Sequence, residues 1–181
     1  MFPRKAPHTM LQYSCYYIKE AIEYTMEKRV TDSMVETVHI IRPTDLNGAK
    51  RLFGGTLMSW IDEVAVVVAK RHAQMNVTTA SVDNLSFLHA ARMRDIVVMI
   101  GKITYVGTTS MEIKVESYVE HLDGTRELVN RAFLTMVGLD EDGHPAALPS
   151  LHLETPEEHA EYLAAKKRRA FRTEHRMGLS H

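Results

Sequence analysis

The sequence contains very little cysteine and almost no net charge, and both shortages exclude classes of protein. Cys15 is the single cysteine among 181 residues, so the chain forms no internal disulfide, and a reducing compartment is favoured. The 22 basic and 23 acidic residues give a formal net charge of -1. Overall charge therefore predicts attraction to neither nucleic acid nor a membrane surface.

Long apolar runs are missing as well. No stretch reaches the roughly 18 consecutive apolar residues of a membrane-spanning helix, so no membrane span is expected. The N-terminus carries Arg4 and Lys5 but lacks an apolar core and a small-residue cleavage site, which argues against secretion and favours the cytoplasm. The length and the 45% share of hydrophobic residues suit one domain with a sizeable core.

Several common catalytic and binding motifs are also absent. The ten histidines include no pair with the usual metal-ligand spacing on a recognisable helix, so no metal site is expected. No nucleophile elbow of the GxSxG type is present. The basic run 166–169 lacks interleaved aromatic residues, which disfavours nucleic-acid binding. This run suits either a solvated helix end or attraction for phosphates.

The sequence does contain one long apolar helix, predicted from Phe53 to about Ala73. Its apolar residues recur at helical spacing, and most residues between them are apolar too, so the helix should be buried nearly all round. The recurring residues are Phe53, Leu57, Trp60, Ile61, Val64, Val67 and Val68. We expect the rest of the chain to wrap around this helix, which Asn76 should end.

Two polar features interrupt the apolar helix. Gly54 and Gly55 lie at its start, where the first amide N–H groups have no intrahelical partner and missing side chains let an electronegative ligand atom approach. Asp62 follows about two turns later, where a carboxylate needs partners or contact with water. The glycines also suit a tight turn or close helix packing, and Asp62 also suits a hydrogen-bonded core acid. The residues alone leave both interpretations open.

The remaining patterns predict one antiparallel sheet curled around the helix. Segments rich in β-forming residues at 35–41, 77–87, 95–106, 110–121 and 126–139 are separated by turns. Alternation within 110–121 predicts a half-buried strand. Such a sheet covers the central helix on one side only, so a second copy is expected to complete its burial. Thr155 and Pro156 then begin a C-terminal helix with a basic end.

The N-terminal residues are expected to form an extension to this domain. Residues 10–28 suit a helix, so the predicted division is a partly helical extension, 1–30, followed by a domain at 31–181 with a basic C-terminal helix and tail. We hypothesise that residues 1–25 are dispensable for activity.

The motifs around the central helix resemble those of a known family. The run comprises Asn47-Gly48, Phe53-Gly54-Gly55 and Trp60-Ile61-Asp62, and it continues through 77–83, 106–112 and 132–135. It resembles the hotdog-fold acyl-CoA thioesterases from about residue 26 to about residue 172. The resemblance implies an α+β hotdog fold, in which a curved antiparallel β-sheet wraps around a long central helix, with a C-terminal helix added. Ala90 and Arg94 stand where the family usually has a proline and a glycine.

The resemblance implies hydrolysis of acyl-CoA to a free carboxylic acid and coenzyme A. Coenzyme A would then be part of the substrate, and no separate cofactor is expected. The amide of Gly55 would stabilise the oxyanion formed by attack on the thioester carbonyl. Asp62 would activate water as general base or attack directly as nucleophile, and Asn47 would orient the water or the carbonyl.

The resemblance also implies partners. In the family the matching Asn and Asp come from different subunits or tandem copies, so the implied active unit is a homodimer with interface sites, assembled into a hexamer as a trimer of dimers. Coenzyme A would lie across the interface and be contacted by six positions. These are Gly54, Phe87, Gly107, Thr108, Thr109 and Ser110.

Two other functions stay open. A hotdog dehydratase or hydratase usually has a catalytic histidine near the helix start, and none lies between His39 and His72, which disfavours that alternative. A non-catalytic acyl-CoA-binding or assembly module would keep the fold without turnover, and the presence of both Asn47 and Asp62 disfavours it.

Overall fold

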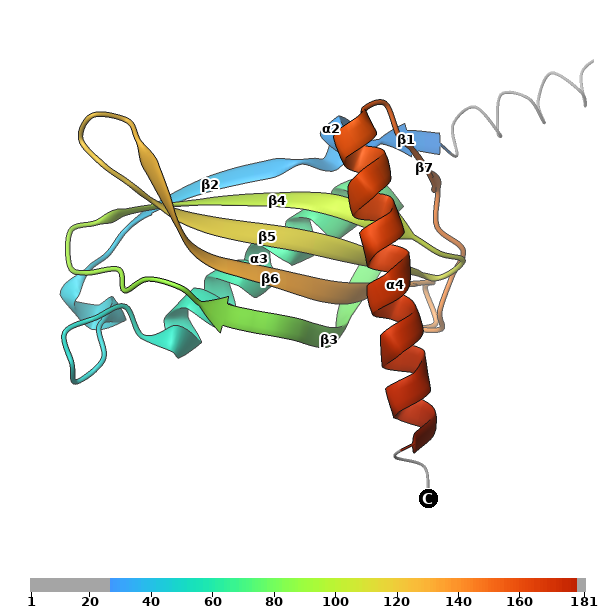
Figure 1. The fold of residues 1–181 in the computed structure, drawn as a ribbon. Coiled ribbons are helices and arrows are strands. Elements are labelled where there is room, and N and C mark those ends of the chain that lie inside the picture. Colours follow the sequence, from blue (N-terminus) through green and yellow to red (C-terminus); the bar gives the residue numbers. More distant parts are fainter. Residues whose placement is uncertain (1–26, 179–181) are drawn as a thin grey trace, which may run out of the picture.

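The computed structural model describes residues 27–178, and of residue 84 and residues 175–178 it describes the backbone alone (Figure 1). In chain order the elements are β1 (Glu27–Arg29), α2 (Val30–Ser33), β2 (Val35–Ile40), the 3-10 turn η1 (Pro43–Asp45), α3 (Gly54–Ala73), β3 (Asn76–Phe87), β4 (Ile96–Val106), β5 (Ser110–Glu120), β6 (Arg126–Leu139), β7 (Ser150–His152) and α4 (Pro156–Gly178). None of the described helices is long and apolar enough to cross a membrane.

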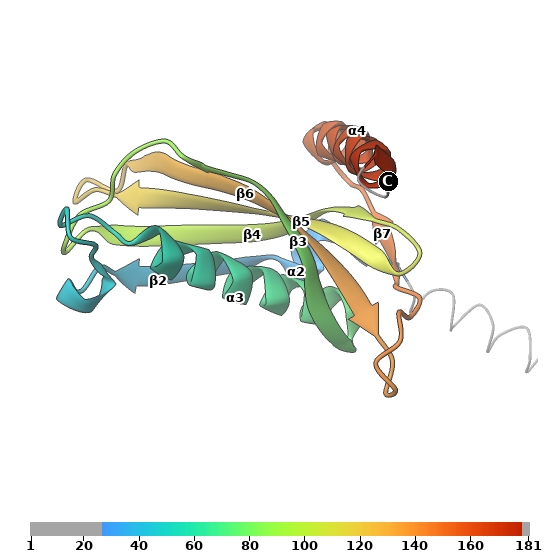
Figure 2. The same ribbon diagram turned by 90° about the horizontal axis from the view of Figure 1, so that it is seen from below.

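Five strands form one antiparallel sheet in the order β2-β4-β5-β6-β3. Figures 1 and 2 show α3 along one face of this sheet and α4 crossing the opposite face. We call the face toward α3 the inner face and the face toward α4 the outer face. The predicted fold class, a curved antiparallel sheet around a long helix with a C-terminal helix added, is confirmed.

Helix α3 begins at the glycine pair and ends at Ala73, as predicted, but the residue that caps its end is not the expected one. Gln74 has φ 55°, in the left-handed region, and its N–H donates to the carbonyl of Lys70. This cap ends the helix at Ala73. The prediction that Asn76 ends the helix is wrong, because Asn76 is already the first residue of β3 and pairs with Leu139.

The inner face of the sheet packs closely against one side of α3. A Cβ atom on Gly101 of β4 would lie 2.5 Å from Cγ1 of Val64, so the absence of a side chain there lets helix and strand approach. Other parts of α3 are open: Met58 and Val67, on different sides of the helix, are 42% and 40% exposed, and Ser59, Glu63 and Lys70 are exposed as well. The expectation of burial nearly all round is therefore wrong for the single chain. A second copy of the chain was expected to cover the part of α3 that the sheet leaves open.

The outer face is more buried than the alternation of β5 predicted. Glu112 and Lys114 are 1% and 5% exposed, because α4 lies across this part of the sheet. The half-buried strand predicted for 110–121 is thus buried on both faces near its start. Helix α4 begins at Pro156 as predicted, and the N–H of Glu158 donates to Oγ1 of Thr155 at 3.1 Å.

A short parallel pairing ties the start of the described chain to the segment just before α4. β1 pairs with β7, and Val30 just after β1 is buried. The folded part therefore includes residues 27–30, earlier than the expected start at residue 31. The helix expected at 10–28 lies outside the described residues apart from residues 27 and 28, which are in a strand.

Candidate active site

The start of α3 presents backbone amides that no side chain caps. Phe53 is the N-cap residue and supplies no side-chain hydrogen bond. A Cβ on Gly55 would lie 2.6 Å from Cε1 of Phe53, and a Cβ on Gly54 would lie 3.1 Å from Cζ of Phe87. The glycine pair therefore both begins the helix and accepts two aromatic rings against the backbone. Both interpretations left open by the sequence, ligand approach and close packing, fit this geometry.

Asp62 lies about two turns into α3 and is half-buried. Its Oδ1 accepts a hydrogen bond from Oγ1 of Thr79 on β3 at 2.6 Å. The partner expected for a carboxylate on an apolar helix is thus present, and partial exposure leaves the group accessible. Sequence reasoning missed Thr79, since nothing in the chain signals that this strand position faces Asp62. The sequence shows only that Thr79 is two residues from Val77 and therefore on the same face of the strand.

Asn47 lies in the turn before α3, where the oxygen of its side-chain amide is hydrogen-bonded and the nitrogen has no hydrogen-bond partner among the described residues. Its Oδ1 accepts the N–H groups of Ala49 and Arg51 at 2.9 and 3.2 Å. Because the oxygen is engaged, the side chain can offer its Nδ2 hydrogens as donors. Asn47 was expected to act as donor or acceptor, and this geometry favours the donor role toward a carbonyl oxygen.

A cavity of about 290 Å³ opens beside Asn47. Its lining residues include Asn47, Leu52, Leu57, Phe87, Leu88 and Val129. The structure thus brings Asn47 and Phe87 together at the start of α3. Asp62 is not among the residues that line this cavity. The expected catalytic pair therefore does not share this cavity within one chain.

The predicted coenzyme A-binding turn, Gly107 to Ser110, lies at the other end of the sheet. It forms the β4–β5 hairpin, in which the N–H of Gly107 donates to the carbonyl of Ser110 at 2.8 Å. Phe87 pairs with Asn130, which pairs with Ser117. Ser117 is seven strand residues from Ser110, roughly 23 Å along β5. Thr108 and Thr109 also lie in the turn, and their carbonyls accept backbone N–H groups from the β6 end and the loop after it.

A basic side chain from α4 stands beside this turn. Nη1 of Arg169 would lie 3.4 Å from a Cβ on Gly107, and it donates to the hydroxyl of Tyr105 at 2.5 Å. Lys166, Arg169 and Tyr105 line one shallow cavity with Thr173. Of the two interpretations of the basic run 166–169, Arg169 fits attraction for phosphates near the turn. Arg168 serves another purpose, because it pairs with the buried Glu112.

The loop at 90–94, where the chain departs from the family pattern, is a tight turn. Arg94 has φ 74°, and its N–H donates to the carbonyl of Ile41 at 3.0 Å. The N–H of Arg92 donates to Oδ2 of Asp95 at 2.7 Å. Both arginine side chains are exposed.

The buried His72 and the half-buried His39 make their contacts away from Gly54. His72 is fully buried near the helix end, with Nε2 2.9 Å from the carbonyl oxygen of Pro149, and burial lowers its pKa. His39 stacks on Trp60 with ring centroids 4.3 Å apart, and burial lowers its pKa as well. Both are therefore neutral at pH 7. Neither supplies the catalytic histidine of a dehydratase at Gly54.

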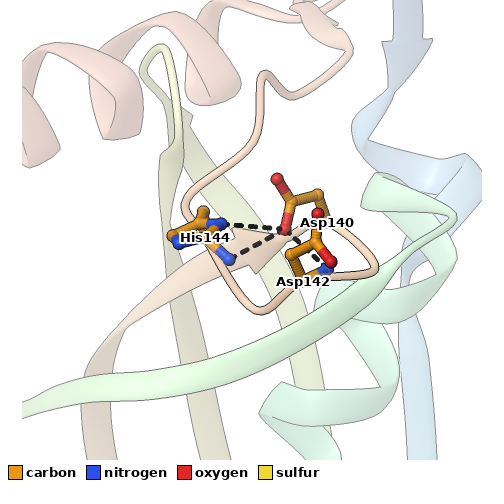
Figure 3. Close-up of side chains that lie close together, drawn as sticks. All are labelled: Asp140, Asp142 and His144. Atoms are coloured by element: carbon orange, nitrogen blue, oxygen red, sulfur yellow. Dashed lines mark hydrogen bonds and ion pairs between the residues drawn. The ribbon is translucent and has the colours of Figure 1, made fainter.

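Asp140, Asp142 and His144 gather in the loop after β6 (Figure 3). All three are exposed. Oδ1 of Asp140 already accepts the N–H groups of Asp142 and His144 at 3.0 and 2.8 Å, and Gly143 between them has φ 82°. The cluster is therefore explained by a hydrogen-bonded turn closed by its first residue.

Three features together define a hotdog-type thioester hydrolase. They are the amide site at the helix start, the half-buried aspartate held by a threonine, and the curved sheet around that helix. Residues 49–123 match the model of the thioesterase superfamily. The chain is 42% identical over 128 residues to the uncharacterized acyl-CoA thioester hydrolase YkhA of Bacillus subtilis (strain 168), covering 70% of this chain and 74% of that protein. The chain belongs to the acyl-CoA thioester hydrolases of the thioesterase superfamily.

Solved structures agree with this assignment. The acyl-CoA hydrolase of Staphylococcus aureus, in complex with butyryl coenzyme A, coenzyme A and coenzyme A disulfide, is 33% identical with a TM-score of 0.80, covering 84% of this chain and 93% of that one. Structures of that enzyme also exist with an aspartate, a threonine or an asparagine replaced by alanine. An apo-hexameric acyl-CoA thioesterase is 35% identical with a TM-score of 0.80, covering 84% and 98%.

Some relatives are much longer than this chain. The cytosolic acyl coenzyme A thioester hydrolase of Rattus norvegicus is 33% identical over 143 residues, which is 77% of this chain and 37% of that protein. The chain therefore spans little more than a third of that relative.

Proposed function

We propose that this chain hydrolyses the thioester of acyl-CoA to a free carboxylic acid and coenzyme A. One observation carries the proposal: Asp62 is a half-buried carboxylate, fixed by Thr79, that lies about two turns inside a helix whose first amides are uncapped. The replaced residues of the Staphylococcus aureus enzyme support it. They are spaced along that chain as Asn47, Asp62 and Thr79 are spaced here.

Asp62 acts as general base in this proposal. It takes a proton from water as the water oxygen attacks the thioester carbonyl, and the hydrogen bond from Thr79 holds the carboxylate in position. The N–H of Gly55 stabilises the oxyanion, a kind of interaction whose loss commonly raises the barrier by about 3 to 4 kcal/mol. Gly55 is about 10 Å of helix away from Asp62 of its own chain, so the Gly55 of this centre comes from the second copy. The C–S bond then breaks, the carboxylic acid forms, and the coenzyme A sulfur receives the proton.

Asn47 reaches this centre from a second copy of the chain. Within one chain it lies in a cavity that Asp62 does not line. Around the start of α3 and along β3, exposed apolar side chains are present that a second copy would cover. These are Phe53, Met58, Val82 and Phe87. We therefore propose a homodimer with paired interface sites, assembled into a hexamer, as in the relative described as hexameric.

The nucleotide part of coenzyme A docks at the turn from Gly107 to Ser110. Exposed hydroxyls in the turn and the guanidinium of Arg169 beside it suit phosphate oxygens. Phe87 and Gly54 lie at the far end of the same sheet, so they serve the acyl end. We assign the reaction to lipid metabolism in the cytoplasm, by analogy with the relative named cytosolic.

Thiol release from a panel of acyl-CoAs, measured for wild type and single variants, tests the assignment. Asp62→Asn should lower kcat by about 10³-fold, because it removes the general base while keeping the size of the side chain. Asn47→Ala should lower it as well. Glu63→Gln is the matched control, since Glu63 is the exposed neighbour of Asp62 and should keep full activity. Unchanged turnover in Asp62→Asn would falsify the catalytic role. Acyl-CoA binding without thiol release in wild type would establish a non-catalytic module instead.

Mixing the two inactive variants tests the interface. If Asn47 and Asp62 of one site come from different chains, a mixed dimer of Asn47→Ala and Asp62→Asn contains one intact site and one doubly altered site. Random mixing should then restore activity at about one quarter of all sites. A mixture that stays as inactive as its components would place both residues in the same chain.

One turnover in ¹⁸O-water separates the two roles of Asp62: label in the acid supports a general base, and label in the protein supports a nucleophile.

A further inference from the structure

A row of four side chains crosses the inner face of the sheet beside the start of α3. The register pairs Met99 with Ser117, Ser117 with Asn130, and Asn130 with Phe87. Met99 belongs to the buried core, as do the residues two positions before and after Ser117. The row ends at the helix start, because the Phe87 ring packs against Gly54.

The two middle members of this row, Ser117 and Asn130, are polar, and each has one side-chain oxygen without a hydrogen-bond partner among the described residues. Ser117 and Asn130 are both 0% exposed. Nδ2 of Asn130 donates to the carbonyl of Ser86 at 2.7 Å, which fixes the orientation of the amide. Oδ1 of Asn130 and Oγ of Ser117 have no hydrogen-bond partner among the described residues. Unpaired polar atoms are uncommon in a core, because each loses its bonds to water without replacing them.

Neither Asn130 nor Ser117 lines the cavity that contains Asn47, but Asn130 lies directly behind its wall. Phe87, the register partner of Asn130, and Val129, its chain neighbour, both line that cavity. Leu57, from the second turn of α3, lines it as well. The polar pair therefore lies behind the wall of the space where the proposed function places the acyl end of the substrate, with Asn130 nearer to it than Ser117.

We propose that Asn130 and Ser117 bind a hydroxyl group on the acyl chain, so that the preferred substrates are hydroxyacyl-CoAs. The inference rests on the proposed thioesterase function and names its substrate class. A hydroxyl can donate to Oδ1 of Asn130 and accept from the Ser117 hydroxyl, which satisfies both atoms at once. An oxo group can only accept, so it satisfies Ser117 alone. A methylene satisfies neither. The expected order of substrates is hydroxyacyl, then oxoacyl, then saturated acyl.

Four thioesters of the same length test this order with the full chain: 3-hydroxybutyryl-, 4-hydroxybutyryl-, acetoacetyl- and butyryl-CoA. We expect kcat/KM for the better hydroxy substrate to exceed that for butyryl-CoA by about tenfold or more. Asn130→Leu and Ser117→Ala should each bring this ratio close to one. A wild type that hydrolyses butyryl-CoA as well as both hydroxy substrates overturns the inference, and so does a ratio that neither variant changes.

Thr135→Val is the matched control. Its Oγ1 is also buried without a partner in the described part of the chain, but Thr135 pairs with Glu112 and so belongs to the outer-face positions. The substitution should leave the substrate ratio unchanged. If Asn130→Leu fails to fold, Ser117→Ala decides, because it removes a single atom that no described residue binds. Failure of the thioesterase proposal is distinguishable, since it would show as no thiol release from any of the four substrates.

Discussion

The two faces of the five-stranded sheet are held to their helices by opposite means. Ile113 and Glu112 are adjacent on β5, and their side chains are 0% and 1% exposed. Ile113 faces α3 in an apolar core, whereas Glu112 faces α4 and is bound by two arginines and a threonine. Burial of apolar side chains is the main stabilising interaction on the inner side. The outer side needs nearly complete hydrogen bonding to offset the loss of water from its charges.

The charges under α4 form one continuous cluster. Arg168 donates from Nη2 to Oε1 of Glu112 at 2.8 Å, and its guanidinium lies 3.8 Å from the centroid of the Phe133 ring. Arg172 donates from Nη1 to Oε2 of Glu112 at 3.1 Å and to Oδ2 of Asp83 at 2.8 Å. Every carboxylate oxygen of Glu112 thus has a partner. Oγ of Ser117 and Oδ1 of Asn130 on the inner face differ from this carboxylate, because they have no partner among the described residues, and this difference is the basis of the ligand role proposed for them.

The largest effect should come from breaking the outer cluster. Glu112→Leu keeps a side chain of similar size but leaves Arg168 and Arg172 without their shared carboxylate. The free energy of unfolding should fall by about 3 to 5 kcal/mol, as measured by urea denaturation. Ile113→Val, one position away on the inner face, removes a single methylene and should cost only about 0.5 to 1.5 kcal/mol.

Removing both charges should undo much of this loss. Glu112→Leu combined with Arg168→Met replaces the pair by apolar groups, and such replacements are often close to neutral. Arg172 keeps its bond to Asp83 in this double variant. If the double variant is no more stable than Glu112→Leu alone, then unpaired charge is not the cause of the loss, and the contrast between the faces is mistaken.

A smaller effect separates two buried hydroxyls, one on each face. Oγ1 of Thr104 donates to Oε1 of Glu112 at 2.8 Å, whereas Oγ of Ser117 has no described partner. Thr104→Val should therefore lower the free energy of unfolding by about 1.5 to 3 kcal/mol, because a hydrogen bond to a buried charge is lost. Ser117→Ala should change it by no more than about 0.5 kcal/mol. Equal losses in the two variants would mean that Ser117 has a partner and would also weaken its proposed role toward substrate.

The parts of this molecule that the sequence predicted are those with a local cause. Helical periodicity placed α3, the Thr155 and Pro156 pair placed the start of α4, and turns between β-rich segments placed the strands. The burial of Glu112 was not predicted, because it depends on Arg168 and Arg172, which are far away in the chain. Local patterns say nothing about such a partner.

The candidate site also contains residues that the sequence identified and residues that only the three-dimensional arrangement reveals. Motifs identified Asp62 and Asn47, but the bond from Thr79 depends on how β3 lies against α3. Nor does spacing along the chain reveal that the turn at Gly107 and the ring of Phe87 lie at opposite ends of the sheet. The polar pair Ser117 and Asn130 is likewise a product of strand register, since the two residues are directly opposed on β5 and β6.

Acid should weaken the two sides at different pH, and this is the smallest effect we expect. Burial lowers the pKa of His72 on α3 from its ordinary value of 6.5, so the folded state resists its protonation. Stability is then lost as pH falls from about 6.5 toward the lower folded pKa. On the outer face burial tends to raise the pKa of Glu116, but Lys114 and Arg131 outweigh it and hold the pKa below the ordinary 4.5. This contribution persists above about pH 4.5 and is lost only below it.

Urea denaturation across pH should therefore show two separate declines. His72→Gln should flatten the upper one and leave the lower one intact, with His39 accounting for any remainder, because its pKa is lowered too. Glu116→Gln should do the reverse, and a variant that flattens both declines would show that the two faces do not respond to acid independently.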